Sequence, residues 1–262
     1  MTDTTQPAGP RALATLHPRD GIAVLRSAMP LPDLGGQLAN NAFVFDGREP
    51  MLVDTGFALL SEDMLAALAA EIDPRRLRRI FLSHADADHV GNLAAVLELA
   101  PEARVLTGFL GYAKLMLTGF PVDRVQVIAP GDTLDLGDRR LSVLRPPYYD
   151  APETLGFHDA ASDTLFVVDA FGAVLPAITR TAEQIDDDAL DRGLETWSQL
   201  DAPWLASLDR AALEASLAAL SALAPRLVLG AHLPPALDVD ALIERILRLH
   251  ARGRAPALRN AA

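Results

Sequence analysis

The sequence predicts an α/β fold in which β-sheets pack as a sandwich and helices cover them. Three observations support this fold class. Short apolar runs typical of strands fall in two blocks, helical stretches lie between and after the blocks, and no internal repeat or flexible linker divides the 262 residues. A chain of this length can bury a large core. We therefore expect one domain over residues 21–262, preceded by a polar, disordered tail over residues 1–20.

The first block alternates strands with helices. We expect strands at residues 42–45, 51–53 and 80–83, and helices at residues 61–72 and 90–99. Asp46-Gly47, between the first two strands, is a hairpin signal. Apolar residues recur at helical spacing from Leu60 to Ile72. Asp73-Pro74 is typical of an N-cap followed by proline at the first helical position, and Pro101 ends the last helix of the block.

The second block is rich in strands and is followed by helices. We expect strands at residues 103–107, 125–128 and 164–168, with further strand structure within residues 133–144 around a Leu136-Gly137-Asp138 turn. Residues 179–224 are expected to be helical, with the acidic run 186–188 as a solvated helix start. A strand at residues 227–229 and an amphipathic helix over residues 238–250 complete the pattern.

Composition excludes several classes of function. The chain has no cysteine, which excludes disulfides, thiolate metal ligands, iron–sulfur clusters and a cysteine nucleophile. With 35 acidic and 23 basic side chains the net charge is −12, which argues against nucleic acid and anionic membranes as partners. The N-terminus has no apolar stretch typical of a secretory signal, and the most hydrophobic segment, residues 211–232, is interrupted by charges and proline. We therefore expect a cytoplasmic protein, and homo-oligomer formation stays open.

The strongest chemical signal is the run from Ser83 to Asn92, where a buried strand gives way to a helix. It contains two imidazoles and two carboxylates within six residues, namely His84, Asp86, Asp88 and His89. The small Ala85 and Ala87 alternate with these side chains and leave them room to converge on a cation. The alternative is a solvated acidic loop with two incidental histidines. Four ligand types alternating with alanine favour the metal site.

These residues also carry a family resemblance. His84-x-Asp86-x-Asp88-His89 resembles the HxHxDH signature of the metallo-β-lactamase superfamily, and Leu52-Val53-Asp54-Thr55-Gly56 resembles the strand and turn that precede it there. The resemblance covers most of the chain, from about Asn41 to His232. It implies an αββα sandwich of two mixed sheets flanked by helices, with a metal site at one edge of the sheets.

The resemblance also implies three further ligands. Asp150 occupies the ligand position of the loop at residues 147–154, Asp169 is the bridging aspartate that follows the strand at residues 164–168, and His232 follows the late strand. Without the resemblance, Asp169 and His232 would be weak signals. An aspartate at a strand end is often a turn residue, and a lone histidine there is more often structural.

Two departures from the signature point to one branch of the superfamily. Asp86 and Asp150 stand where the superfamily has histidines. A carboxylate at the first of these places is similar to the di-iron core of flavodiiron proteins, although those usually carry Glu at the position of Asp86 and His at that of Asp150. The resemblance then implies two metal ions, one held by His84, Asp86 and Asp150, the other by Asp88, His89 and His232, with Asp169 bridging. The oxygen-rich first set favours iron, or manganese, over zinc.

Three functional hypotheses follow. The favoured one is a flavodiiron-like non-haem di-iron centre that binds or reduces a diatomic such as dioxygen. We expect no flavin domain in this chain, so electrons would come from a separate redox partner. The alternative is a metal-dependent hydrolase of an ester, thioester, lactone or phosphoester that uses a metal-bridging hydroxide. The third is a degenerate member with an empty first site and a structural second one.

A few residues are candidates for supporting roles. Asp54 is expected to hold the metal loop through hydrogen bonds rather than to bind metal. The Tyr148-Tyr149 pair flanks a proposed ligand, and Tyr149 could orient water or substrate, although packing is the commoner use of such a pair. His158 could be a supporting or substitute ligand, or a residue of a surface turn. Trp197 and Trp204 could form a lid or a dimer contact, or pack in the core.

Overall fold

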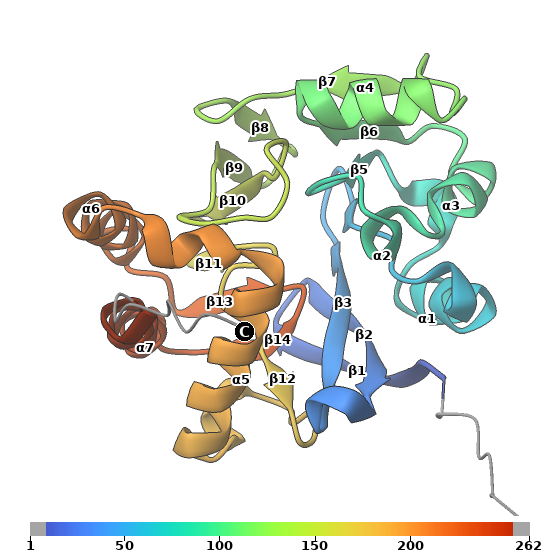
Figure 1. Ribbon diagram of the computed structural model, residues 1–262. Helices are drawn as coiled ribbons and strands as arrows, with labels where there is room; N and C mark the ends of the chain where they lie inside the picture. Colours follow the sequence, from blue (N-terminus) through green and yellow to red (C-terminus); the bar gives the residue numbers. More distant parts are fainter. Residues whose placement is uncertain (1–8, 254–262) are drawn as a thin grey trace, which may run out of the picture.

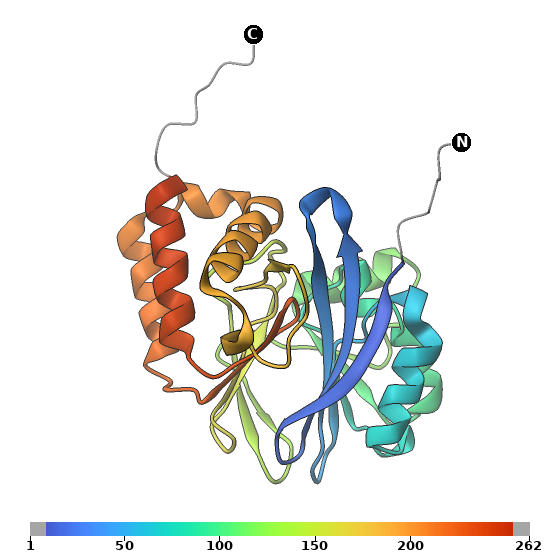
Figure 2. The same cartoon turned by 90° about the horizontal axis from the view of Figure 1, so that it is seen from below.

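The computed structural model describes residues 9–253. Two mixed β-sheets pack face to face, and helices cover the outer face of each (Figure 1). Turned by 90°, the same molecule shows the four layers in cross-section, with helices at both sides and strands between them (Figure 2). The predicted αββα sandwich of two mixed sheets is therefore confirmed.

The first sheet has eight strands. They are β1 (Arg11–Arg19), β2 (Ile22–Leu31), β3 (Gly36–Phe45), β4 (Met51–Val53), β5 (Arg79–Phe81), β6 (Arg104–Thr107), β7 (Val125–Val127) and β12 (Val174–Leu175). The strands β1 to β4 pair antiparallel in chain order, β4 to β7 pair parallel, and β12 pairs with β3. The parallel part brings the carboxyl ends of β4, β5 and β6 to one edge of the sandwich.

The second sheet has six strands in the order β14-β13-β11-β10-β9-β8. They are β8 (Thr133–Asp135), β9 (Arg140–Leu144), β10 (Gly156–Asp159), β11 (Thr164–Phe166), β13 (Leu227–Gly230) and β14 (Leu233–Ala236). Only β11 and β13 pair parallel. Both of these strands end at the edge where β5 of the first sheet also ends, so loops from the two sheets meet there.

Helices cover both sheets. The first is covered by α1 (Ser61–Glu71), α2 (Ala87–Val90), α3 (Leu93–Leu99) and α4 (Phe109–Leu117), and the second by α5 (Asp187–Asp201), α6 (Arg210–Ser221) and α7 (Val239–Gly253) (Figure 1). Short 3₁₀ turns lie at Pro32–Leu34, Ala58–Leu60, Pro74–Arg76, Ala182–Gln184 and Pro203–Ser207. Within residues 9–253, no helix is both long and apolar enough to cross a membrane.

The core lies in three apolar layers, one between the sheets and one beneath each set of helices. Five phenylalanines fill the central layer, and their rings meet in mostly edge-to-face pairs with centroids 5.1 to 6.3 Å apart; these are Phe43, Phe45, Phe81, Phe157 and Phe166. Such pairs add to the free energy gained by burying the rings. This packing fixes the two sheets, and with them the loops at the shared edge.

Several sequence predictions need correction. Residues 11–19 are not part of a disordered tail but form the edge strand β1, because an edge strand can be polar on its solvent side and still pair on the other. Residues 1–8 lie outside the described residues. The helix expected over residues 90–99 is divided at Gly91-Asn92, and the helical stretch 179–224 is divided near Pro203. Local sequence patterns did not predict α4 or the strands β2, β10, β12 and β14.

Candidate metal centre

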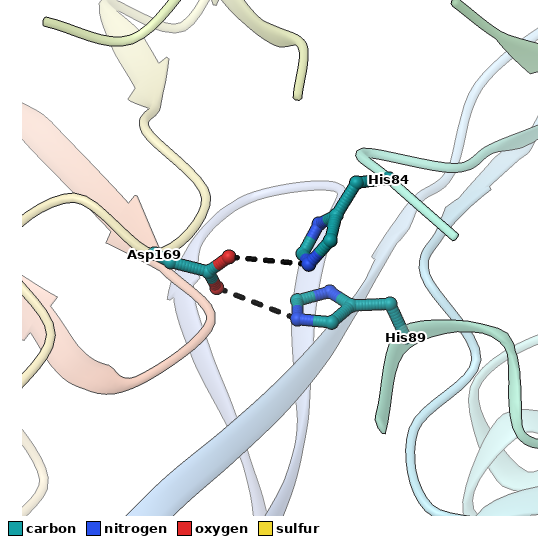
Figure 3. Close-up of side chains that lie close together, drawn as sticks. All are labelled: His84, His89 and Asp169. Atoms are coloured by element: carbon teal, nitrogen blue, oxygen red, sulfur yellow. Dashed lines mark ion pairs between the residues drawn. The ribbon is translucent and has the colours of Figure 1, made fainter. Parts of the chain in front are cut away.

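The predicted ligands come from both sheets and meet at the shared edge. His84 follows β5, and Asp86, Asp88 and His89 lie at or in the short helix α2. From the second sheet, Asp150 lies between β9 and β10, Asp169 follows β11, and His232 lies between β13 and β14. Figure 3 shows the carboxylate of Asp169 directed toward the rings of His84 and His89. One cluster therefore contains residues that are more than 140 positions apart in the sequence, such as His84 and His232.

Asp169 lies at the middle of this cluster. Its Oδ2 is 3.4 Å from Nε2 of His84, and its Oδ1 is 3.4 Å from Nε2 of His89 (Figure 3). The same Oδ1 is 3.1 Å from Nε2 of His232. The side chain is 2% exposed, so all three imidazoles face a carboxylate that water hardly reaches.

Two further groups of donors flank Asp169. Oδ2 of Asp88 is 3.4 Å from Nε2 of His89 and 3.3 Å from Nε2 of His232. On the other side, Nε2 of His84 is 4.0 Å from Oδ2 of Asp86 and 3.8 Å from Oδ2 of Asp150. In each of these groups the three donor atoms lie within 4.8 Å of one another, close enough to share one cation. The structure thus brings all the predicted ligands together, in the two sets that the family resemblance implies. That they bind metal stays a prediction.

The histidines are held from behind by their other ring nitrogen. Nδ1 of His89 donates to Oδ2 of Asp54 at 2.9 Å, and Nδ1 of His232 donates to the carbonyl oxygen of Ala39 at 2.7 Å. Nδ1 of His84 lies 3.1 Å from the Ser83 hydroxyl oxygen. This arrangement fixes each ring with Nε2 directed into the cluster, which is how proteins orient imidazole ligands of metals.

Asp54 also anchors the loop that carries the first two histidines. Its Oδ1 accepts the backbone N–H of Ser83 at 2.9 Å, and its Oδ2 accepts the Ser83 hydroxyl at 2.8 Å. The backbone φ of Asp54 is 55°, a left-handed conformation that aspartate and asparagine tolerate better than most residues. Thr55 adds a hydrogen bond from its hydroxyl to the carbonyl oxygen of His89 at 2.9 Å. Asp54 therefore stands behind the cluster, as the sequence predicts.

The electrostatics of the cluster reflect its mixture of buried acids and imidazoles. Burial lowers the pKa of His232, but the nearby carboxylates of Asp169 and Asp88 outweigh this effect and raise the pKa to about 10. The pKa of His89 is also raised by its carboxylate neighbours against the effect of burial. Burial raises the pKa of Asp169, yet three imidazoles hold it well below its usual range. In the metal-free chain these histidines therefore keep protons that a bound metal ion would replace.

The donors fit a pair of divalent cations. Nε2 of His89 and Oδ1 of Asp169 are buried and lie 3.4 Å apart, but neither has a partner with hydrogen-bond geometry. A buried polar atom without a partner costs free energy, and a metal ion would satisfy both atoms at once. The set of His84 with Asp86 and Asp150 offers mainly carboxylate oxygens, which suit iron or manganese better than zinc.

The residues predicted to support the centre differ in where they lie. Tyr148 is buried, and its hydroxyl oxygen accepts the backbone N–H of Phe171 at 2.6 Å. The ring of Tyr149 contacts Trp204, with centroids 5.5 Å apart, and the guanidinium of Arg145 lies over it, so Tyr149 is used in packing. His158 lies within β10 and belongs to none of the donor groups found among the described residues.

Two residues near the cluster were not anticipated. Asp201 ends α5, and one of its carboxylate oxygens lies within 4.8 Å of oxygens of Asp150 and Asp169. Burial and the charges of Asp169 and Asp150 raise its pKa to about 8. Lys114 on α4 is the only lysine of the chain, and its Nζ is 2.5 Å from Glu153 and 3.5 Å from Asp86. All other basic side chains of the chain, apart from histidine, are arginines, and this exception in composition is the sequence signal that could have identified Lys114.

The chain is similar to a known family and to several known proteins. A family model described as "ODP family beta lactamase" matches residues 38–232. The chain is 28% identical over 159 residues to a rubredoxin-oxygen oxidoreductase of Megalodesulfovibrio gigas, an alignment that covers 60% of this chain and 39% of that protein. It is 27% identical over 147 residues to a nitric oxide reductase of Moorella thermoacetica, with 56% and 37% covered. The chain thus spans well under half the length of these relatives.

Solved structures show the same fold. The rubredoxin oxygen:oxidoreductase of Desulfovibrio gigas superimposes with a TM-score of 0.80 at 22% identity, over 91% of this chain and 62% of that one. The flavodiiron protein of Giardia intestinalis gives 0.79 at 17% identity, over 92% and 60%. A fragment, residues 1–254, of a putative diflavin flavoprotein of Nostoc gives 0.78 at 19% identity, over 94% and 98%. At these identities the likeness establishes the sandwich architecture.

Proposed function

The chain belongs to the ODP family of beta lactamases, and from this membership we propose that it is a flavodiiron-like core with a dinuclear non-haem iron centre. Its proposed activity is to bind or reduce a diatomic molecule such as dioxygen or nitric oxide. Relatives named rubredoxin-oxygen oxidoreductase, nitric oxide reductase and flavo-diiron protein support this class of substrate.

The position of Asp169 carries the proposal. Its Oδ2 faces His84, whereas its Oδ1 faces His89 and His232, so the two oxygens face different sets of donors. A carboxylate in this position can bridge two metal ions. We assign the two ions to His84, Asp86 and Asp150 on one side and to Asp88, His89 and His232 on the other.

Iron bound by these residues would supply one-electron chemistry and open coordination positions for a diatomic ligand. The protein's part is to fix the ligands and to limit the access of water. Asp54 and the carbonyl oxygen of Ala39 hold His89 and His232 in place. The indole of Trp197 packs against His232, with ring centroids 4.7 Å apart, and so shields one side of the centre. Asp86 is the most exposed proposed ligand, with 44% of its side chain accessible, which makes its side the route of entry in this proposal.

A metal-dependent hydrolase is the alternative function. The same donors could hold metal ions that activate water for attack on an ester or phosphoester. The relatives compared above are named as an oxidoreductase and a reductase, which favours the redox function.

Reduction needs an electron donor. We propose that electrons come from a redox partner protein. The name of one relative suggests a rubredoxin-like protein as the first donor to try.

The test uses the full chain loaded with iron under anaerobic conditions and reduced chemically. We expect it to consume dioxygen or nitric oxide, as measured with gas-selective electrodes. An Asp169→Asn variant, which loses the bridging charge, should lose this consumption. A wild-type chain that holds two iron ions and consumes neither gas, but hydrolyses a member of an ester, thioester, lactone and phosphoester panel, would replace the proposal with the hydrolase.

A further inference from the structure

The last turn of α5 (Asp187–Asp201) lies against the candidate metal centre. Trp197 and Asp201 are four residues apart, so both side chains lie on the same face of this helix. Trp197 contacts His232, with ring centroids 4.7 Å apart. It also lies directly over Gly172, where a Cβ atom would collide with the indole nitrogen. These contacts fix the end of the helix on the centre, and Asp201 with it.

Asp201 meets two of the proposed ligands there. Single carboxylate oxygens of Asp150, Asp169 and Asp201 lie within 4.8 Å of one another. Oδ2 of Asp201 is buried and has no hydrogen-bond partner. Among residues 9–253 no ion pair joins Asp201 to a basic side chain. Of the three acidic groups, Asp150 and Asp169 face imidazoles, whereas Asp201 is paired with none of the described lysines, arginines or histidines.

Fold stability does not explain an aspartate at this place. A helix C-terminus carries partial negative charge, which disfavours an acidic side chain. Asp169 is 2% exposed and its Oδ1 has no hydrogen-bond partner, so this is not a solvated acidic patch. Asp150 and Asp169 face imidazoles, but Asp201 has no such partner. Burial of a carboxylate without a partner is costly, and a cation bound between Asp201 and Asp150 would offset that cost. The convergence of these three groups therefore points to a bound cation.

We propose that Asp201 is a further ligand of the first metal ion and joins Asp150 in its coordination. The inference rests on the proposed dinuclear centre and deepens it. With Asp201, five carboxylates face the two ions, since Asp86, Asp88, Asp150 and Asp169 already do. Two divalent ions would then leave one excess negative charge, which suits metals of higher charge such as ferric iron. The fifth carboxylate makes the first site still richer in hard oxygen donors.

The test compares metal binding by the full-length wild-type chain and two substitutions of Asp201. Metal-free protein is titrated with Mn(II), which can be followed by electron paramagnetic resonance, and bound metal per chain is measured after gel filtration. We expect two ions per wild-type chain. In Asp201→Asn the affinity for one ion should fall at least tenfold while the other is retained. Asp201→Glu, which keeps a carboxylate, should restore part of the loss.

Asp188→Asn is the matched control. Asp188 lies on the same helix, is exposed at its opposite end, and loses the same charge when substituted. This variant should bind two ions with wild-type affinity. Thermal unfolding of the metal-free proteins adds a second measurement. Asp201→Asn should unfold at the same temperature as the wild type or higher, because Oδ2 of Asp201 has no hydrogen bond to lose, whereas loss of a purely structural aspartate would lower that temperature.

The outcomes separate this inference from the proposed function. If Asp201→Asn binds both ions within twofold of wild-type affinity, Asp201 is not a ligand and the dinuclear centre stands without it. If the metal-free Asp201→Asn chain unfolds well below the wild type, Asp201 is structural. If the wild-type chain binds no metal ion, the proposed function and this inference are both contradicted.

Discussion

Replacing Asp54 by asparagine tests how far the residues behind the cluster control metal binding. Asp54 is 1% exposed and accepts three hydrogen bonds, two from Ser83 and one from His89. Its φ of 55° suits asparagine as well as aspartate, so the backbone conformation can be kept. The substitution therefore removes the charge and places an N–H₂ group in the site of one carboxylate oxygen.

The expected effect follows from which hydrogen bonds survive. With its carbonyl oxygen in place of Oδ1, asparagine still accepts the Ser83 N–H, and the Ser83 hydroxyl can rotate to accept from the new amide. Nδ1 of His89 cannot rotate away, so its N–H would face another N–H. Loss of one buried hydrogen bond to a charged group costs about 1.5–3 kcal/mol of unfolding free energy. Loss of such a partner behind a metal ligand typically weakens metal binding about 10–100-fold.

Urea unfolding of the metal-free proteins measures the first quantity, and competition with a chelator measures the second. Ser83→Ala is the comparison variant. It removes an uncharged hydroxyl that faces Nδ1 of His84 and leaves the hydrogen bond between Asp54 and His89 intact. We expect Asp54→Asn to bind metal much more weakly than Ser83→Ala. Equal metal affinity in Asp54→Asn and the wild type would show that the geometry of His89 does not depend on this hydrogen bond.

Three further predictions concern other parts of the chain. Gly91→Ala should lower the unfolding free energy by about 1–3 kcal/mol, because its Cβ would press on the backbone of residues 56–58. Urea unfolding measures this, and an unchanged midpoint would show that this loop yields. The metal-free chain should lose stability between about pH 6.5 and pH 10. The pKa of His232 is raised from 6.5 to about 10, so its protonated form stabilises the fold fully below pH 6.5, and this contribution is lost as the pH rises to 10. His232→Gln should flatten this part of the pH profile, and equal profiles would contradict the reasoning. Lys114→Met should destabilise the chain, because it leaves Glu153 buried and unpaired. In urea unfolding, the double variant with Glu153→Gln should recover part of the lost stability. A double variant no more stable than Lys114→Met would show that the two residues are not coupled.

Local signals made part of the fold and of the site predictable. The strand at residues 51–53 is observed with the same bounds, because an apolar run between turn residues needs no distant information. His84, Asp86, Asp88 and His89 converge because they share one strand end, so their spacing alone predicted the cluster. Asp150, Asp169 and His232 were found only through the family resemblance, since they come from distant strands.

What the sequence did not show depends on long-range packing. The polar composition of residues 11–19 does not predict β1. Backbone pairing with β2 holds this segment in the strand conformation, rather than the burial of its own side chains. Asp201 gives no local signal either, since it reaches the centre only through the packing of α5. Lys114 lies on a helix that was not predicted, and its two acidic partners come from separate loops.

The central claim is a dinuclear iron centre, and metal analysis of the protein as isolated tests it most directly. We predict two iron ions per chain, together with a change in visible absorption when the reduced protein meets dioxygen. Zinc as the sole metal, or iron in less than one equivalent with no optical response to dioxygen after anaerobic loading, would contradict the account.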